Sequence, residues 1–154
     1  ELVERWNEVI PKDAIVFHLG DFSLTANMKE LDSLIHKLNG DIHLIIGNHE
    51  KDALGKSYIR DKWASISDIA EIYIKDSEIT YGEQHIVMCH YPMMAWNGSH
   101  RGSWHLFGHV HGGLSNKGVL QHSKTALDVG VDCHDFRPLS YQEVKELITK
   151  QAMS

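Results

Sequence analysis

The decapeptide Asp41–Glu50, DIHLIIGNHE, contains a mostly apolar run that is followed directly by polar residues. The run at 42–46 is long enough and apolar enough to predict a buried strand, and Gly47 ends it. Asn48–Glu50 then follow directly at the carboxyl end of that strand. Such loops are the usual place for a ligand site in open α/β sheets. The stretch therefore predicts both a strand and a polar site beside it.

Three other apolar runs end in the same way. IVFHLGD at 15–21 ends in Gly-Asp, IVMCH at 86–90 ends in a histidine, and HLFGHVH at 105–111 ends in two histidines. If the four strands lie side by side and run roughly parallel, their carboxyl ends meet at one edge. The side chains that we expect to converge there are Asp21, Asn48, His90, His109 and His111.

Helices are predicted between and after these strands. Periodic apolar positions indicate helices over 2–10, 27–39 and 140–151, the last opened by a capping box of Ser140 and Glu143. Shorter helices are predicted at 51–56 and 58–64, followed by a short strand over 71–75 and a hairpin over 78–90 that turns at residues 82–83. Alternating strands and helices predict one α/β domain, with a mixed sheet or two packed sheets.

Composition narrows the function. The 154 residues are 42% hydrophobic and 23% charged, with a formal net charge of −6, so no broad nucleic-acid-binding surface is expected. No apolar run approaches the roughly 20 residues of a membrane span. Cys89 and Cys133 form no CxxC motif, which suits a reducing compartment and predicts a cytoplasmic protein. Oligomeric state is left open.

The converging side chains are metal ligands by type. Carboxylate, amide oxygen and imidazole suit Mn²⁺, Fe or Zn²⁺, and the lack of paired cysteines argues against a closed structural zinc site. In an extended segment, residues two apart project to one side with Cα atoms about 6–7 Å apart. Two metals of a hydrolytic pair lie about 3.5–4 Å apart, so His109 and His111 suit different metals.

Four motifs in this order resemble the signature of the calcineurin-like metallophosphoesterases. They are GDF at 20–22, GNHE at 47–50, the histidine of CHYP at 89–92, and GHVH at 108–111. The resemblance extends from Asp13 to about Pro138. It implies one domain over 1–154, built as a four-layer α/β/β/α sandwich of two mixed sheets flanked by helices, with a dinuclear metal site at the strand ends.

The resemblance also implies a role for each residue. Asp21 would bridge two divalent ions (Mn, Fe, Zn or Ni), with Asn48, His90 and His109 completing one site and His111 belonging to the other. His49 would face the substrate as a catalytic residue. The implied reaction is hydrolysis of phosphate mono- or diesters, a nucleotide among them, by attack of a metal-bound hydroxide on phosphorus.

One part of the family pattern is missing. An Asp-x-His motif normally precedes GD on an earlier strand and ligates the same metal as His111, yet His18 has no aspartate two positions before it. We therefore expect a domain that is N-terminally incomplete and lacks its first strand. The alternative function is a truncated, weakly active or inactive metal-binding domain. A metallo-β-lactamase-like hydrolase would need an HxHxDH run, which is absent.

Plainer interpretations stay open for each motif. Gly47–Glu50 and 108–113 are compatible with glycine turns, and His90 with a hydrogen-bonded core histidine. His100 and Arg101 are candidate substrate-binding residues, although ordinary loop packing is the favoured explanation of them. Asp128 and Asp132 are expected to be structural. Structural or surface roles are also expected for the remaining histidines: His18, His36, His43, His85, His105, His122 and His134.

Overall fold

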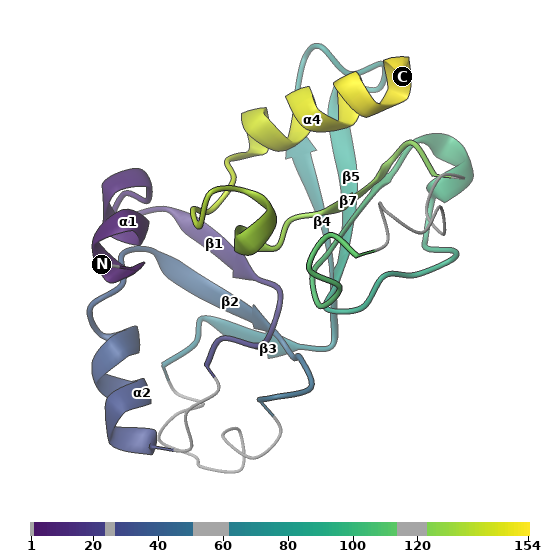
Figure 1. Cartoon of the computed structure of the whole chain (residues 1–154). Coiled ribbons are helices and arrows are strands. Elements are labelled where there is room, and N and C mark those ends of the chain that lie inside the picture. The colour runs from purple at the N-terminus through teal and green to yellow at the C-terminus, as the bar shows by residue number, and fades with distance from the viewer. Residues whose placement is uncertain (1, 24–26, 51–61, 114–122) are drawn as a thin grey trace.

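The computed structural model describes residues 2–23, 27–50, 62–113 and 123–154 (Figure 1). Seven strands of these residues fall into two sheets. The first sheet has the order β1-β2-β3, built from β1 (Ile15–His18), β2 (Asp41–Ile45) and β3 (Ser65–Ser67). All its pairings are parallel, with Ile15 opposite Asp41 and His43 opposite Ser65.

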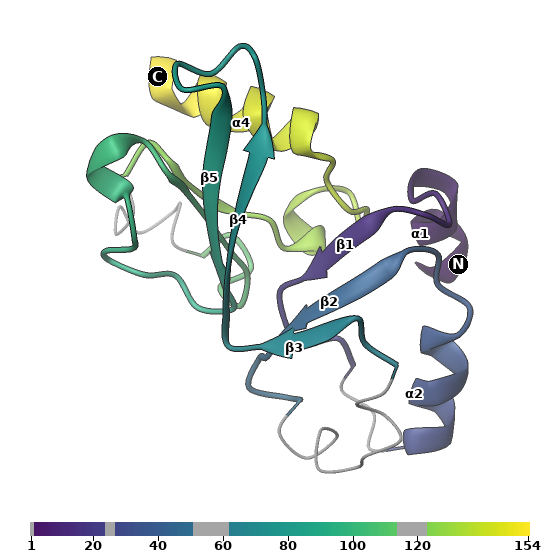
Figure 2. The same ribbon diagram turned by 180° about the vertical axis from the view of Figure 1, so that it is seen from behind.

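The second sheet has the order β4-β5-β6-β7. Its strands are β4 (Ile69–Lys75), β5 (Glu83–Cys89), β6 (Trp104–Phe107) and β7 (Ala126–Asp128). β4 and β5 form an antiparallel hairpin, whereas β5, β6 and β7 pair in parallel. A hairpin is thus present in this region, but its first strand is β4, which was predicted as a separate short strand, and its turn spans residues 76–82. Figure 2 shows how the chain leaves β3 and rises directly into this hairpin.

Three α-helices and two one-turn 3₁₀ helices accompany the strands in the described residues. The α-helices are α1 (Leu2–Val9), α2 (Met28–Ile35) and α4 (Tyr141–Met153); the 3₁₀ helices are η1 (Ser99–Arg101) and η3 (Val131–Cys133). The capping box predicted at Ser140 and Glu143 is present. The predicted helix at 51–56 and most of that at 58–64 lie outside the described residues. None of the described helices is long and apolar enough to cross a membrane.

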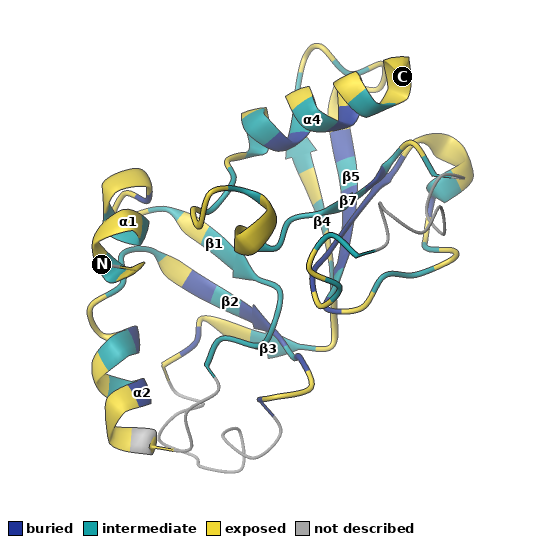
Figure 3. Cartoon of the chain, viewed as in Figure 1, coloured by how far each residue is buried: buried dark blue, intermediate teal, exposed yellow. Residues whose placement is uncertain are grey.

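Two hydrophobic clusters hold the elements together, and Figure 3 marks which positions along the chain are buried. In the first, Leu31 and Ile35 of α2 pack on Ile42 and Leu44 of β2, with Trp6 of α1 beside them. This cluster covers one face of the first sheet with α1 and α2. It forms because β2 alternates its side chains, which places Ile42 and Leu44 on the same face.

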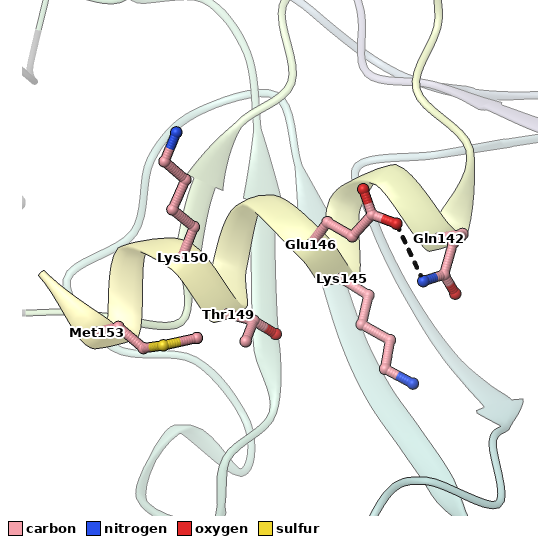
Figure 4. A pocket seen from close by; sticks show the side chains of 6 residues that line it. All are labelled: Gln142, Lys145, Glu146, Thr149, Lys150 and Met153. Carbon is pink, nitrogen blue, oxygen red and sulfur yellow. Dashed lines mark hydrogen bonds between the residues drawn. The ribbon is translucent and has the colours of Figure 1, made fainter.

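In the second cluster, Val144 and Ile148 of α4 pack on the face of the second sheet that carries Ile86 and Leu106. Phe17, on the other face of the first sheet, packs against the same cluster. The outward side of α4 is open to solvent and forms a shallow depression (Figure 4). The depression is lined by residues of α4 alone: Gln142, Lys145, Glu146, Thr149, Lys150 and Met153.

The predicted four-layer α/β/β/α sandwich of two mixed sheets is wrong. The first sheet is entirely parallel, and α4 lies on the face of the second sheet that also meets β1. The opposite face, carrying His105, is met by the loop at 91–103, where the Trp96 ring lies against the His105 ring at 5.1 Å between centroids, tilted by 34°. Residues 86–88 of β5 and all of β6 are buried, so both faces of these strands are covered and sequence periodicity alone could not say which face the helix covers.

Candidate metal centre

The polar side chains at the strand ends come from both sheets. Asp21 and Asn48 follow β1 and β2 of the first sheet, whereas His90 and His109 follow β5 and β6 of the second. Each pair of strands is parallel, so each pair ends at a common edge. The four runs therefore do not lie side by side in one sheet, and their ends meet where the two sheets come together.

His90 is the centre of this meeting point. Its Nε2 atom lies 3.1 Å from Asn48 Oδ1, 3.1 Å from His109 Nδ1 and 3.4 Å from Asp21 Oδ2. The His90 side chain is only 2% exposed, whereas Asp21 is 24% exposed. Asp21, His90 and His109 form a group that is able to hold one metal ion. Asn48 adds its amide oxygen as a fourth donor atom at the same point.

The proton on His90 is directed away from these partners. His90 Nδ1 lies 2.6 Å from the carbonyl oxygen of Leu19, and because a carbonyl only accepts hydrogen bonds, Nδ1 must carry hydrogen. In the neutral ring, Nε2 is then a lone pair that faces the oxygens of Asn48 and Asp21. Acceptor atoms that converge in this way are satisfied by a cation between them, or by a second proton on the ring at Nε2. A backbone carbonyl that fixes the tautomer of a histidine is also common around metals.

Close backbone approach makes this geometry possible. Gly20 has φ +90°, and a Cβ atom built there would lie 2.5 Å from His90 Nδ1 and 2.6 Å from the Gly47 nitrogen. Only glycine adopts such a conformation without strain and leaves that space. Asp21 and His109 also have positive φ, at 54° and 68°. Strained non-glycine residues at a ligand cluster are typical of functional sites.

Glu50 is a supporting residue that sequence reasoning did not single out. Its buried carboxylate accepts hydrogen bonds from the backbone nitrogens of Phe22 and Gly47. It thereby ties the loop after β1 to the loop after β2. His49 completes this link, because its backbone nitrogen donates to Asp21 Oδ1 at 3.1 Å. The signal in the sequence that could have identified Glu50 is its position as the last residue of the GNHE motif.

His111 lies outside the group formed by Asp21, His90 and His109. Its exposed ring contacts a carboxylate oxygen of Asp132 through Nδ1. Asp128 supports this pair, since its two oxygens accept from the backbone nitrogens of Gly112 and Gly130, each at 2.9 Å. Asp132, which was expected to be structural, contacts the predicted ligand His111.

The remaining predicted residues are distributed as follows. The His49 side chain is exposed beside Asn48. His100 and Arg101 form part of η1, which precedes the amino end of β6, whereas His109 follows the carboxyl end. The structure therefore separates these two residues from the metal group by the length of the strand. Their role in substrate binding stays a prediction.

Tyr91 is a further residue beside the metal group. Its ring makes edge contacts with the rings of His90 and His109, both at 4.8 Å between centroids, and it is 43% exposed. The aromatic ring therefore forms part of the rim of the candidate site. It follows His90 directly in CHYP, which was the signal available in the sequence.

His18 lies close to the metal group without joining it. Burial lowers the pKa of His18 to about 4, with the Asp21 charge opposing that shift and His90 adding to it. Its Nδ1 atom is buried and has no partner among the described residues. The ring stacks beside Trp6 and meets Phe22 edge-on at 5.0 Å. A neutral histidine packed among aromatic rings fits the structural role predicted for it.

Comparison with known proteins supports the fold and assigns no activity. No family model matches the chain. It is 26% identical over 151 residues to the uncharacterized protein MJ1445 of Methanocaldococcus jannaschii, covering 97% of this chain and 74% of that protein. The crystal structure of the protein of unknown function AQ665 from Aquifex aeolicus matches with a TM-score of 0.66 and 20% identity, covering 95% of this chain and 82% of that one.

Proposed function

We propose that this chain is a metal-dependent phosphoesterase of the calcineurin-like kind. The observation that carries the proposal is the convergence of Asp21, Asn48 and His109 on an Nε2 atom of His90 whose proton is directed elsewhere. Mixed carboxylate, amide and imidazole donors with no cysteine suit Mn²⁺, Fe or Zn²⁺. A metal bound there would supply Lewis-acid stabilisation of charge on a phosphoryl oxygen and lower the pKa of a water.

The side chains around this group have separate roles in the proposal. In the proposal Asp21 would bridge the two metals; its Oδ2 faces His90, and the backbone nitrogen of His49 donates to Oδ1 and so holds the carboxylate in place. His49 is the proposed catalytic residue, which donates a proton to the leaving group from its exposed position beside Asn48. His111 is the proposed ligand of the second metal. The substrate class is a phosphate mono- or diester, with nucleotides included.

The experiment is ester hydrolysis by metal-loaded protein. Wild type should hydrolyse p-nitrophenyl phosphate or its bis ester, and Asn48→Ala and His109→Ala should each lose about 100-fold or more, because each removes a ligand. His36→Ala is the matched control, since the exposed His36 ring hydrogen-bonds only Asp32 and Lys62 among the described residues. Equal turnover by wild type and both ligand variants would contradict the proposal.

A second candidate is a metal-binding domain without turnover. One observation favours it: the described ligand group contains Asp21, His90 and His109, while His111 stands apart against Asp132. Metal analysis separates the two candidates. Two equivalents with hydrolysis support the phosphoesterase, and one equivalent without hydrolysis supports the binding domain. The predicted cytoplasmic location stays a prediction, which fractionation of cells tests directly.

A further inference from the structure

The pairing of His111 with Asp132 joins two distant segments beside the metal group. His111 ends the GHVH motif after β6, and Asp132 lies in η3 after β7. The contact joins Nδ1 of the imidazole to Oδ2 of the carboxylate. Asp132 is the only described residue that hydrogen-bonds the His111 ring.

The backbone on both sides of this pair is held independently of it. Asp128, at the end of β7, accepts from Gly112 on one side and from Gly130 on the other. Its Oδ2 also lies 3.8 Å from Cys133 Sγ. The turn that carries His111 and the turn that carries Asp132 are therefore clamped together by a single side chain. These backbone hydrogen bonds bring the imidazole and the carboxylate together, independently of the attraction between the two side chains.

Stability does not explain the pair. The His111 side chain is 75% exposed and that of Asp132 is 33% exposed. Exposed ion pairs contribute about 0–1 kcal/mol at most, because water competes for both partners. His111 also holds a positive φ of 49°, which a side chain adopts at some cost. The pair therefore contributes little to folding.

The chemistry of the contact defines that role. A carboxylate only accepts hydrogen bonds, so the atom facing it, Nδ1, must carry hydrogen. The neutral ring then presents its lone pair at Nε2, the atom available to a metal. His90 is arranged in the same manner, with Nδ1 on the Leu19 carbonyl and Nε2 toward the metal group. Carboxylate-histidine pairs of this kind orient ligands and raise their basicity.

We propose that Asp132 is a positioning residue that holds His111 as the Nδ1–H tautomer and prepares its Nε2 atom to bind the second metal. The inference rests on the proposed function only in its use of a second metal; the tautomer itself is a property of the metal-free chain. Asp132 acts through His111 and does not touch the substrate.

The first test measures the tautomer without metal or substrate. Nitrogen-15 chemical shifts of the His111 ring, identified by their loss in His111→Ala, distinguish protonated from unprotonated nitrogens at about pH 8, where an ordinary histidine is neutral. Wild type should show a protonated Nδ1 and an unprotonated Nε2. Asp132→Ala should shift the ring to a mixture or to Nε2–H, and Asp132→Glu should restore the wild-type pattern. A wild-type ring protonated at Nε2 would overturn the inference.

The second test measures metal binding. Asp132→Ala should weaken binding of the second metal equivalent about 10–100-fold and leave the first equivalent unchanged, with partial recovery in Asp132→Glu. Asp135→Asn is the matched control, because Asp135 is an exposed neighbour at φ 58°, a conformation that asparagine also adopts. Unchanged affinity for the second equivalent in Asp132→Ala contradicts the inference.

Failure of this inference is distinguishable from failure of the proposed function. The expected tautomer with no ester hydrolysis would support the role of Asp132 and reject the phosphoesterase. Hydrolysis that is identical in wild type and Asp132→Ala, with an identical tautomer, would support the phosphoesterase and reject the role of Asp132. Melting temperatures of the two proteins should be close, which separates positioning from a loss of folding.

Discussion

At the scale of single residues, the site depends on the hydrogen bond that His90 makes and on the absence of a side chain at Gly20. His90 donates from Nδ1 to the Leu19 carbonyl, so that Nε2 of the neutral ring presents its lone pair to the oxygens of Asn48 and Asp21. Gly20 lets that ring approach, because a side chain in its place would meet His90 and Gly47 at under 3 Å. The absence of a Cβ atom at Gly20 and the hydrogen bond from His90 Nδ1 therefore contribute to the geometry of the candidate metal group together with the ligands themselves.

Gly20→Ala should disrupt this arrangement. The new Cβ atom meets backbone at Gly47 as well as the His90 ring, and alanine at φ +90° is strained. We expect a loss of about 2 kcal/mol or more in unfolding free energy and weaker binding of the first metal equivalent. Urea unfolding and metal titration measure both.

Gly82→Ala is the control for Gly20→Ala. Gly82 also has positive φ, at 72°, yet no described atom lies within 4 Å of the point that a Cβ atom would occupy. The substitution should cost only about 1 kcal/mol, from backbone conformation, and leave metal binding unchanged. Equal losses of metal affinity in both variants would show that steric crowding at His90 is not the cause.

At the scale of elements, α4 is joined to the β4–β5 hairpin by a polar contact as well as by its apolar face. Lys145 Nζ lies 2.7 Å from Asp76 Oδ2, and the Tyr141 hydroxyl donates to the same oxygen at 2.6 Å. These hydrogen bonds stabilise the charged carboxylate and lower the pKa of Asp76 to about 2. The bond from Lys145 has the larger effect, and the bond from Tyr141 the next largest. The pKa of Tyr141 rises to about 12, through burial and the Asp76 charge.

This contact predicts a pH dependence of stability. Because the folded pKa of Asp76 lies below its unfolded value of about 3.9, its contribution is present above about pH 4 and is lost as pH falls toward 2. Asp76→Asn should melt at lower temperature than wild type at pH 7, and the difference should shrink as pH falls toward 2. Thermal melts across this range measure it.

Glu78→Gln is the control for Asp76→Asn. Glu78 also contacts Lys145, but its side chain is 75% exposed, so solvent screens the interaction. A small, nearly pH-independent difference from wild type is expected. If Asp76→Asn behaved in the same way, the contact between α4 and the hairpin would contribute little to stability.

At the scale of the whole molecule, the candidate centre exists because two sheets are held together. Asp21 and Asn48 belong to the first sheet, His90 and His109 to the second. Phe17 and Leu19 of the first sheet pack against the cluster formed by the second sheet and α4. The same segment thus supplies the apolar contact between sheets, the carbonyl for His90 and, two residues later, Asp21.

Phe17→Ala should therefore affect stability and metal binding together. Removing a partly buried phenylalanine should cost about 2–3 kcal/mol and loosen the position of Asp21 relative to His90. Calorimetric unfolding and titration of the first metal equivalent check the two effects. Ile72→Ala removes a side chain of the same cluster from within the second sheet, and it should destabilise the protein while leaving metal affinity close to wild type.

Much of the candidate site was predictable from the sequence, whereas the way in which helices and loops cover the two sheets was not. Asp21, Asn48, His90 and His109 each follow an apolar run that ends at or near a glycine or histidine, and this local pattern is present in the structure. The α/β/β/α prediction failed at β5 and β6, where both faces are buried. A continuous run of mostly apolar residues indicates burial on both faces, and it does not show that α4 covers one and the loop at 91–103 the other.

The sequence by itself determined which residues are available as ligands and where the strands end, because apolar runs, glycines and caps act over a few neighbouring residues. The tertiary structure alone decided that the ligands come from two sheets, that His90 directs its proton to Leu19, and that His111 meets Asp132. Those facts depend on contacts between segments 21–71 residues apart, as the bonds from His111 to Asp132 and from His90 to Leu19 show. Such distant contacts are set by the packing of the whole chain, and no local pattern encodes them.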